Sequence, residues 1–273
     1  MRRLPTRLYR LTCRTRHHFV TSIALLVPAF NEAQAMARTA LVMREALDAG
    51  VVSSATVLDG GSTDGTAEVA LQYGIRSLHI PSLQPELGPV LGKGDSLYRG
   101  VHAVPADWYV FLDADLGNIC IDHITALTQH IGEPNISFIK GGFVRVDEHG
   151  EPRDIPAGRV TELVGRPLLR RAAPQLTYLS QPLSGQVAIE GKLARSLSFV
   201  TGYGIEIAML IDVFRQVGAD GIVEADMGAI NNRYKPDDAL EDVRDQVLAG
   251  AALRIITMPD YGLVMHGQVT NRD

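Results

Sequence analysis

Two carboxylates stand two residues apart where an apolar run near the middle of the chain ends. The run from residue 108 to residue 112 has the composition of a buried strand, and Asp113 and Asp115 stand at its end. Because side chains alternate along an extended chain, both carboxylates are expected on the same side, at the carboxyl end of the strand. Ligands bind at that edge in open α/β sheets, and two hard oxygen ligands there suit a divalent cation that holds a diphosphate. A pair that only caps the next helix is the simpler alternative.

Two other segments bring acidic or small residues to the ends of expected strands. The segment 28–32 follows an apolar run at 22–27, and the segment 59–66 follows one at 55–58. Asp59 supplies a further strand-end carboxylate, and the glycines after it let the backbone approach a ligand closely. None of these segments is specific alone, but their order and spacing together predict a ligand site at one edge of a sheet.

Lys93 stands between two glycines at the expected start of a helix. A lysine at such a position can reach a phosphate group or the edge of a base. The segment is not a phosphate-binding P-loop, because the leading glycine and the serine or threonine after the lysine are absent.

Short apolar runs and helical patterns alternate through the first half of the chain. Strands are expected at residues 22–27, 55–58, 75–80 and 107–113, and helices before Gly50, before Tyr73 and after Gly94. Thr63 or Asp64 is well placed to cap the helix that runs to Tyr73. The alternation implies parallel βαβ units with right-handed crossovers, and therefore an α/β fold with a mostly parallel sheet.

Composition limits the class of protein. The 273 residues, 46% apolar and 21% charged, fit a single large globular domain with an elaborated second half. A net charge of −5 argues against general nucleic-acid binding. Two cysteines exclude a disulfide framework or a zinc cluster and favour the reducing cytoplasm. The apolar run at 19–30 is too short to span a membrane.

The first eighteen residues are predicted to lie outside the fold, which we expect to begin at Phe19. The first sixteen residues carry six arginines and no acidic residue. A disordered leader, a transit peptide and a tether to an anionic surface are each compatible with this composition.

Seven short segments together resemble a known enzyme family. VPAFNE at 27–32, LDGGSTD at 58–64, GKG at 92–94 and LDAD at 112–115 resemble a GT-A nucleotide-sugar glycosyltransferase. GRVTEL at 158–163, QPLSG at 181–185 and GYGIEI at 202–207 are similar to glucosyl-3-phosphoglycerate synthases. The resemblance covers about residues 19 to 255. It implies a GT-A fold and retaining transfer of glucose from a nucleotide sugar, expected to be UDP-glucose, to 3-phosphoglycerate.

The resemblance also implies a division of the chain and a set of site residues. Residues 19–145 would form the nucleotide-sugar half and residues 146–273 the acceptor half. The donor would be held by Pro28, Ala29, Phe30, Glu32, Asp59, Gly60, Lys93, Asp113, Ala114 and Asp115. The acceptor would be held by Gly158, Arg159, Val160, Thr161, Tyr203 and Arg233.

Catalysis, the metal and the assembly are further implications of the resemblance. Leu183 would lie beside the anomeric carbon through its backbone, and Glu206 would hold sugar hydroxyls. Asp115 and Asn232 would bind Mg²⁺ or Mn²⁺. The metal and Asp115 would neutralise the leaving diphosphate, with Lys93 or Arg233 assisting, and the acceptor would attack from the face that the diphosphate leaves. A homodimer is also implied.

Two of these residues also have roles that follow from their surroundings. The planar guanidinium of Arg159 matches an oxyanion, and free backbone donors at the expected helix start can add to it, unless Arg159 pairs with Glu162 on the surface. Glu206 stands in an otherwise apolar helix, where an unpaired carboxylate is costly. It is therefore expected to face the site or a buried partner.

Departures from the family pattern concern the metal and the acceptor. Asn232 stands where family members have a histidine, so metal affinity is expected to be lower or to shift towards Mg²⁺. His266 could replace that histidine, or lie on the surface. Gln186 and Ile230 stand where charged residues are usual. Transfer to another acceptor, glycerate or a polyprenyl phosphate, and a degenerate protein that only binds nucleotide sugar therefore remain alternatives.

The last helical pattern, from residue 237 to residue 256, carries an apolar stripe. It is expected to pack on the domain or on a partner subunit rather than bind a ligand.

Overall fold

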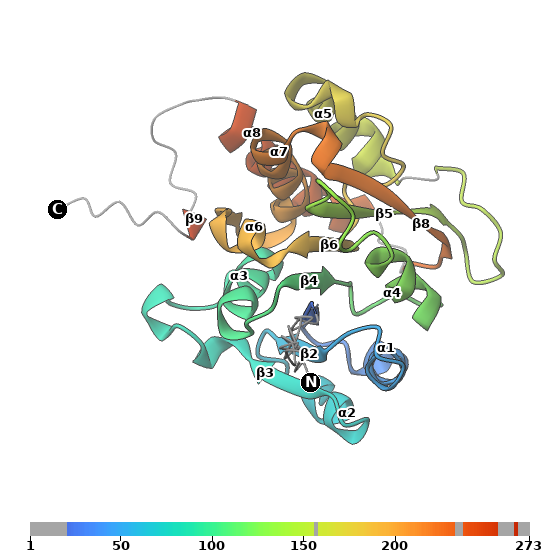
Figure 1. Cartoon of the computed structure of the whole chain (residues 1–273), viewed down its shortest axis with the longest axis vertical. Helices are drawn as coiled ribbons and strands as arrows, with labels where there is room; N and C mark the ends of the chain where they lie inside the picture. Colours follow the sequence, from blue (N-terminus) through green and yellow to red (C-terminus); the bar gives the residue numbers. More distant parts are fainter. Residues whose placement is uncertain (1–20, 156–157, 233–236, 256–264, 267–273) are drawn as a thin grey trace, which may run out of the picture.

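A seven-stranded mixed sheet lies at the centre of the chain, with helices on both faces (Figure 1). The structure, a computed structural model, describes residues 21–155, 158–232, 237–255 and 265–266. The arginine-rich leader and Arg233 lie outside these residues. In the described part of the chain, none of the helices combines the length and apolar character needed to cross a bilayer.

The order of strands in the main sheet is β3-β2-β1-β4-β6-β5-β8. The strands of this sheet are β1 Ile23–Ala29, β2 Ser54–Asp59, β3 Arg76–His79, β4 Trp108–Phe111, β5 Phe138–Arg145, β6 Val187–Glu190 and β8 Ile222–Ile230. β3, β2, β1 and β4 are parallel, β6 runs antiparallel between β4 and β5, and β8 is parallel to β5. One sheet therefore joins the two halves of the chain. A separate two-stranded sheet pairs β7 Phe199–Val200 with β9 Met265–His266.

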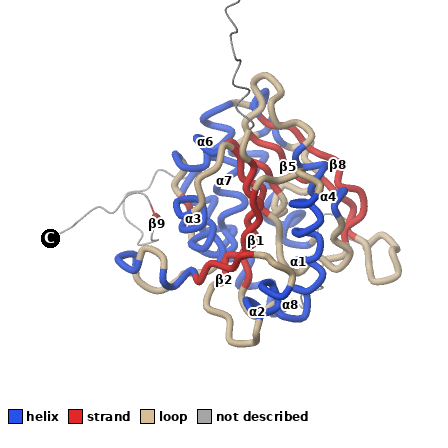
Figure 2. Tube along the Cα trace, turned by 60° about the horizontal axis from the view of Figure 1, so that its bottom comes forward, coloured by secondary structure: helices blue, strands red, loops and turns tan. Residues whose placement is uncertain are grey.

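The helices form two layers, one on each face of the sheet (Figure 2). Helices α1 Ala33–Asp48, α2 Thr66–Gln72 and α4 Ile121–Thr128 cover one face. The other face is covered by α3 Lys93–Ala103, α5 Arg166–Ala172, α6 Gly191–Ser196, α7 Ile205–Val217 and α8 Asp237–Ile255. Both layers are apolar where they meet the sheet, since β1 and β4 are buried from both sides.

The elements expected from the sequence are confirmed, with small shifts at their ends. The four expected strands are β1 to β4, and α8 covers the last helical pattern. The helix expected after Gly94 begins two residues earlier, at Lys93. At the start of α2, Gly65 occupies the capping position with φ 91°, while the Asp64 carboxylate accepts a hydrogen bond from the Thr66 N–H at 3.0 Å. Asp64 thus satisfies a free donor of the helix without being its capping residue.

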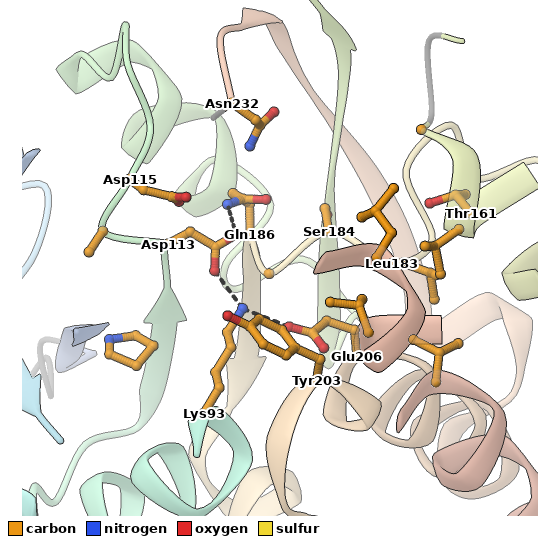
Figure 3. A pocket seen from close by; sticks show the side chains of 18 of the residues that line it. Lys93, Asp113, Asp115, Thr161, Leu183, Ser184, Gln186, Tyr203, Glu206 and Asn232 are labelled. Carbon is orange, nitrogen blue, oxygen red and sulfur yellow. Dashed lines mark hydrogen bonds and ion pairs between the residues drawn. The ribbon is translucent and has the colours of Figure 1, made fainter. Parts of the chain in front are cut away.

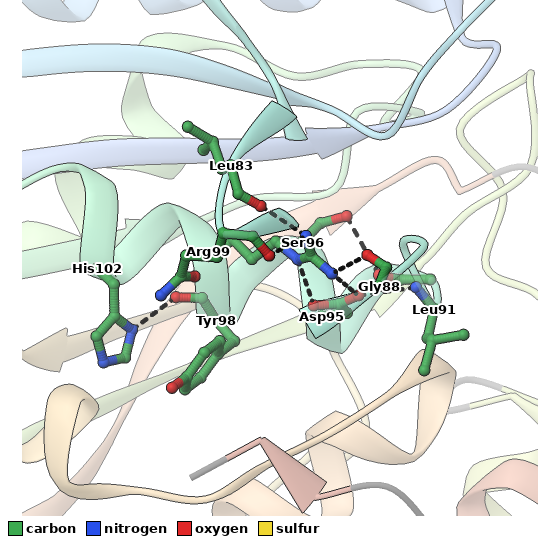
Figure 4. A network of polar contacts seen from close by, with 10 residues as sticks. Leu83, Gly88, Leu91, Asp95, Ser96, Tyr98, Arg99 and His102 are labelled. Atoms are coloured by element: carbon green, nitrogen blue, oxygen red, sulfur yellow. Dashed lines mark hydrogen bonds and ion pairs between the residues drawn. The ribbon is translucent and has the colours of Figure 1, made fainter. Parts of the chain in front are cut away.

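A buried ion pair supports the loop that leads to Lys93 (Figure 4). The side chains of Asp95 and Arg99 are both fully buried and bond one another across one turn of α3 at 2.8 Å. The Arg99 guanidinium also donates to the carbonyl oxygens of Leu83 and Gly88, and Asp95 accepts from the N–H of Leu91. The loop before α3 is therefore anchored to the helix itself.

Candidate active site

A cavity of about 1390 Å³ opens at the carboxyl ends of the central parallel strands. Single small ligands usually occupy pockets of about 300–1000 Å³, so this cavity has room for two. Its walls come from both halves of the chain. The segments that follow β1, β2 and β4 form one side, and residues around 158–161, 183–186 and 202–206 form the other.

Two strand-end loops on the donor side bond to each other. Asn31, whose φ is 55°, donates its backbone N–H to Ser62 Oγ at 2.9 Å and accepts from the Thr63 N–H through its side-chain oxygen. The N–H of Glu32 donates to Thr66 Oγ1 at 2.9 Å. These bonds hold the loop after β1 against the loop after β2 and fix the wall between them.

The donor residues expected from the sequence lie mostly along this wall. Those that line the cavity are Pro28, Ala29, Phe30, Glu32, Gly60, Lys93, Asp113, Ala114 and Asp115. Asp59 is the exception, because it is buried and its carboxylate accepts a hydrogen bond from the Ser62 N–H within its own loop. A direct contact between Asp59 and the donor stays a prediction, and the visible role of this residue is to shape the loop.

Lys93 lies at the centre of the cavity, between two carboxylates from different halves of the chain (Figure 3). Its ammonium bonds Asp113 Oδ1 at 2.5 Å and Glu206 Oε1 at 2.6 Å. Burial alone would lower the pKa of Lys93, but the charges of Asp113 and Glu206 outweigh it and hold that pKa above its ordinary value. Glu206 was expected to face the site or a buried partner, because it stands in an apolar helix. It does both, since it lines the cavity and pairs with Lys93. A Cβ at Gly185 would come within 2.3 Å of this ammonium, so any larger residue there would displace Lys93 from its present position.

The loop before β6 forms the floor of the cavity. Gln186 donates through Nε2 to Asp113 Oδ2 at 2.7 Å, and Lys140 donates to the carbonyl oxygen of Ser184 at 2.6 Å. Lys140 is buried, and desolvation lowers its pKa to about 8, despite the nearby Glu206 carboxylate. Leu183 lines the cavity while its side chain packs on the η3 turn Thr161–Gly165.

Asn232 is brought to Asp115 by pairing between distant parts of the chain. Residues 116 and 232 form an isolated antiparallel bridge, and the side chain of Asn118 accepts from the Asn231 N–H at 2.8 Å. The N–H of Gly117 also donates to the Asn231 carbonyl oxygen at 2.7 Å. Asp115 and Asn232 consequently lie at the same end of the cavity (Figure 3).

The residues at that end fit a hard divalent cation. Oδ1 of Asn232 is covered by protein and has no hydrogen-bond partner among the described residues, a state that a bound cation would relieve. Carboxylate and amide oxygens are ligands that Mg²⁺ accepts, and it commonly takes its remaining ligands from phosphates and water. The described residues contain no group of three or more His, Cys, Asp or Glu side chains that could hold a metal. Asp115 and Asn232 would therefore supply only part of the coordination of such a cation.

The acceptor residues expected from the sequence form the opposite wall. Those that line the cavity are Gly158, Arg159, Val160, Thr161 and Tyr203. A surface ion pair between Arg159 and Glu162 was the alternative expected from the sequence. Glu162 instead bonds Arg166, at 2.8 Å. The backbone N–H of Tyr203 is held by the side chain of Gln246 from α8. Helix α8 packs on α7, as expected, and also lines the cavity through Leu240, Val243, Gln246 and Val247.

The departures from the family pattern fall in different places. Gln186 reaches the site through Asp113, whereas Ile230 is buried in the core between the sheet and α4. The backbone of His266 belongs to β9, which pairs with β7, but its side chain lies outside the described part of the structure, so its expected role as a metal ligand stays a prediction. Of the three substitutions, those at Gln186 and Asn232 therefore bear directly on the site.

Three residues of the site were not found from the sequence. Lys140 and Arg145 lie on β5, where charged residues inside and at the end of an apolar run are a usable signal. Gly185 belongs to the QPLSG segment at 181–185, but its closeness to Lys93 depends on helix α3, which is far away in the sequence.

Comparison with known proteins shows which enzyme family the chain resembles. Residues 24–175 match the model of glycosyl transferase family 2. The chain is 35% identical over 250 residues to glucosyl-3-phosphoglycerate synthase of Mycobacterium tuberculosis, covering 89% of this chain and 76% of that protein. The structure of that synthase with Mn²⁺, UDP-glucose and phosphoglyceric acid matches with a TM-score of 0.79, covering 89% and 82% of the two chains at 35% identity.

A second similar structure belongs to an enzyme that is named for mannose rather than glucose. Mannosyl-3-phosphoglycerate synthase from Rubrobacter xylanophilus matches with a TM-score of 0.80 at 26% identity, covering 89% of this chain and 79% of that one. The identity to the glucosyl enzyme, 35%, is higher than the identity to this mannosyl enzyme. The chain, a GT-A fold with a glycosyl transferase family 2 domain, belongs to the glucosyl-3-phosphoglycerate synthase family.

Proposed function

We propose that this chain is a retaining glycosyltransferase that moves glucose from UDP-glucose to 3-phosphoglycerate and forms glucosyl-3-phosphoglycerate. The observation that carries the proposal is one cavity with room for two ligands. Strand-end carboxylates Asp113 and Asp115 lie on one side of it, and Arg159 lies in the opposite wall. The relatives named as glucosyl-3-phosphoglycerate synthases support the same reaction.

The donor occupies the half formed by residues 19–145 in this proposal. Phe30, whose side chain is largely exposed at the cavity, offers a face for the base, and the backbone around Gly60 borders the same region. Asp113 and Asp115 flank the ribose, the sugar and the metal. Asp115 and Asn232 hold Mg²⁺ or Mn²⁺ together with the diphosphate, and the metal when bound neutralises the charge of that leaving group.

The sugar lies over the floor of the cavity, beside Leu183 and Glu206. Glu206 holds sugar hydroxyls, and its carboxylate is kept in place by Lys93. The same ammonium contributes positive charge near the departing diphosphate. Arg233, expected to assist, lies outside the described residues.

Transfer proceeds on one face of the sugar. The acceptor hydroxyl forms a bond to the anomeric carbon as the bond to the diphosphate oxygen breaks on the same side. The hydroxyl proton passes to the departing phosphate oxygen, so no dedicated side-chain base is needed. Gly158, Arg159, Val160 and Thr161, with Tyr203, hold the acceptor in the half formed by residues 146–273.

Release of nucleotide tests the proposal. UDP-glucose and GDP-mannose are each incubated with and without 3-phosphoglycerate, in Mg²⁺ and in Mn²⁺. We expect UDP release that depends on 3-phosphoglycerate. Release that ignores 3-phosphoglycerate would redirect the search to glycerate or a polyprenyl phosphate, and tight UDP binding without release would indicate a binding protein.

We also propose a cytoplasmic homodimer. The apolar stripe of α8 gives no support to the dimer, because Val247 and Ala251 are buried within the chain against α7 and η5 Gly202–Gly204. Light scattering coupled to gel filtration measures the oligomeric state directly.

A further inference from the structure

Arg145 lines the cavity, and no hydrogen bond or ion pair joins its side chain to another of the described residues. It stands at the end of β5, and its Nε is covered by protein and lacks a hydrogen-bond partner. The guanidinium lies over the ring of Phe143, whose centroid is 5.7 Å from the guanidinium carbon. A guanidinium carries five N–H donors, and covering one without an acceptor is costly. An acceptor atom of a ligand in the cavity would satisfy this donor.

Other covered arginines in the described residues have such acceptors. Arg99 bonds Asp95 and three carbonyl oxygens, and Arg254 bonds the carboxylate of Asp212 at 2.7 Å. Arg153, which also lines the cavity, donates to the carbonyl oxygen of Asn232 at 2.9 Å. Arg145 differs from them in facing a cavity with its donors unmatched.

The position of Arg145 points to the acceptor. A Cβ on Gly158 would lie 3.5 Å from Arg145 Nε and 3.6 Å from its Cζ. The guanidinium therefore lies against the backbone of residues 158–161, the acceptor loop. Arg159 is the next residue of that loop and lines the same cavity. Burial, followed by the charge of Arg153, lowers the pKa of Arg145, while Asp113 and Asp115 act in the opposite direction. A bound anion would favour the charged form.

We propose that Arg145 binds one anionic group of the acceptor, and that Arg159 with the backbone of the acceptor loop binds a second. This inference rests on the proposed function and adds a residue that would recognise one of the two anionic groups of its acceptor. It predicts discrimination against acceptors that carry a carboxylate alone or a phosphate alone. The planar fork of arginine matches either group, so the pattern of losses identifies which one Arg145 holds.

Acceptor kinetics with three compounds test the assignment. Arg145→Met, Arg145→Lys and wild type are compared at saturating UDP-glucose with 3-phosphoglycerate, glycerol 3-phosphate and glycerate. We expect Arg145→Met to raise the KM for 3-phosphoglycerate by about 10- to 100-fold, with the UDP-glucose KM unchanged. The loss should extend to only one of the two acceptors that carry a single anionic group, glycerol 3-phosphate if Arg145 holds phosphate and glycerate if it holds carboxylate. Lysine should restore part of the affinity.

Arg171→Met is the matched control, because it removes the same charge from an exposed position on α5. It should leave every KM unchanged. An unchanged KM for 3-phosphoglycerate in Arg145→Met would overturn the inference. A rise confined to the UDP-glucose KM would also overturn it, because Arg145 would then serve the donor diphosphate.

Direct binding separates failure of this inference from failure of the proposed reaction. Calorimetry with 3-phosphoglycerate and with inorganic phosphate is carried out on wild type and Arg145→Met in the presence of UDP and Mg²⁺. If wild type shows no transfer to 3-phosphoglycerate but loses phosphate binding with Arg145→Met, the anion subsite stands and the reaction is wrong. If neither compound binds more weakly to Arg145→Met, the subsite itself is refuted.

Discussion

Replacing Lys140 by methionine removes a buried ammonium from beneath the floor of the active site. Only 1% of the Lys140 surface is exposed, and its ammonium donates to the carbonyl oxygen of Ser184. Desolvation is the largest influence on its pKa and lowers it from 10.5 to about 8. Methionine has a similar shape and no charge, so the variant isolates the effect of protonation on stability.

The direction of the pH effect follows from the lowered pKa. Below pH 8 the folded protein must carry the charged lysine in a dry site, so the cost to stability is fully present. The cost declines as pH rises from about 8 to 10.5 and is absent above 10.5, because the unfolded chain then also holds a neutral lysine. At 1.36 kcal/mol for each tenfold change in proton affinity, the full cost is about 3 kcal/mol.

Urea unfolding of wild type and Lys140→Met at several pH values measures this cost. The stability of wild type relative to the variant should rise by about 2 kcal/mol between pH 7 and pH 9.5. The lost hydrogen bond to Ser184 shifts the difference between the proteins by a constant and does not affect its slope. Lys192→Met, which removes an exposed lysine of α6, should show no such slope. A difference between wild type and Lys140→Met that stays level with pH would refute the perturbed pKa.

Three other substitutions test the site and its support. Asp115→Ala should abolish turnover and metal-dependent UDP binding while the melting temperature changes little. Near-normal turnover in this variant would contradict the assignment of Asp115 as a metal ligand. Asn232→His should tighten UDP binding in Mn²⁺ more than in Mg²⁺, because imidazole suits softer ions, as calorimetry with each metal can measure. Arg99→Met removes the ion-pair partner of the buried Asp95 carboxylate and should cost about 3–5 kcal/mol in urea unfolding. Pairing it with Asp95→Asn should recover part of the loss.

The donor wall could be predicted from the sequence because its signals are local. Strand β2, which ends at Asp59, and strand β4, which ends two residues before Asp113, are visible as apolar runs, and parallel order brings their ends to one edge. The same reasoning places Lys93, since a helix start beside that edge points into it. Local sequence patterns do not predict that the Lys93 ammonium pairs with Glu206, because Glu206 comes from α7, 113 residues further along the chain.

The metal end of the site depends on contacts that no local pattern encodes. Asn232 was placed there by resemblance, but its approach to Asp115 requires the bridge between residues 116 and 232. The turn at Gly117 and Asn118 supplies two of the bonds that hold this pairing. A Cβ at Gly117 would lie 3.3 Å from the carbonyl oxygen of Asn231, which explains why a small residue follows the carboxylate pair.

The position of β6 explains why donor and acceptor sites form one unit. This strand is antiparallel to both neighbours and lies between β4 of the first half and β5 of the second. The loop that enters β6 therefore passes beside Asp113, where Gln186 bonds that carboxylate and Gly185 makes room for Lys93. Lys140 on β5 holds the same loop from below. Groups expected to bind the nucleotide sugar are thus fixed by residues of the acceptor half, so a change in either half alters the geometry at the sugar.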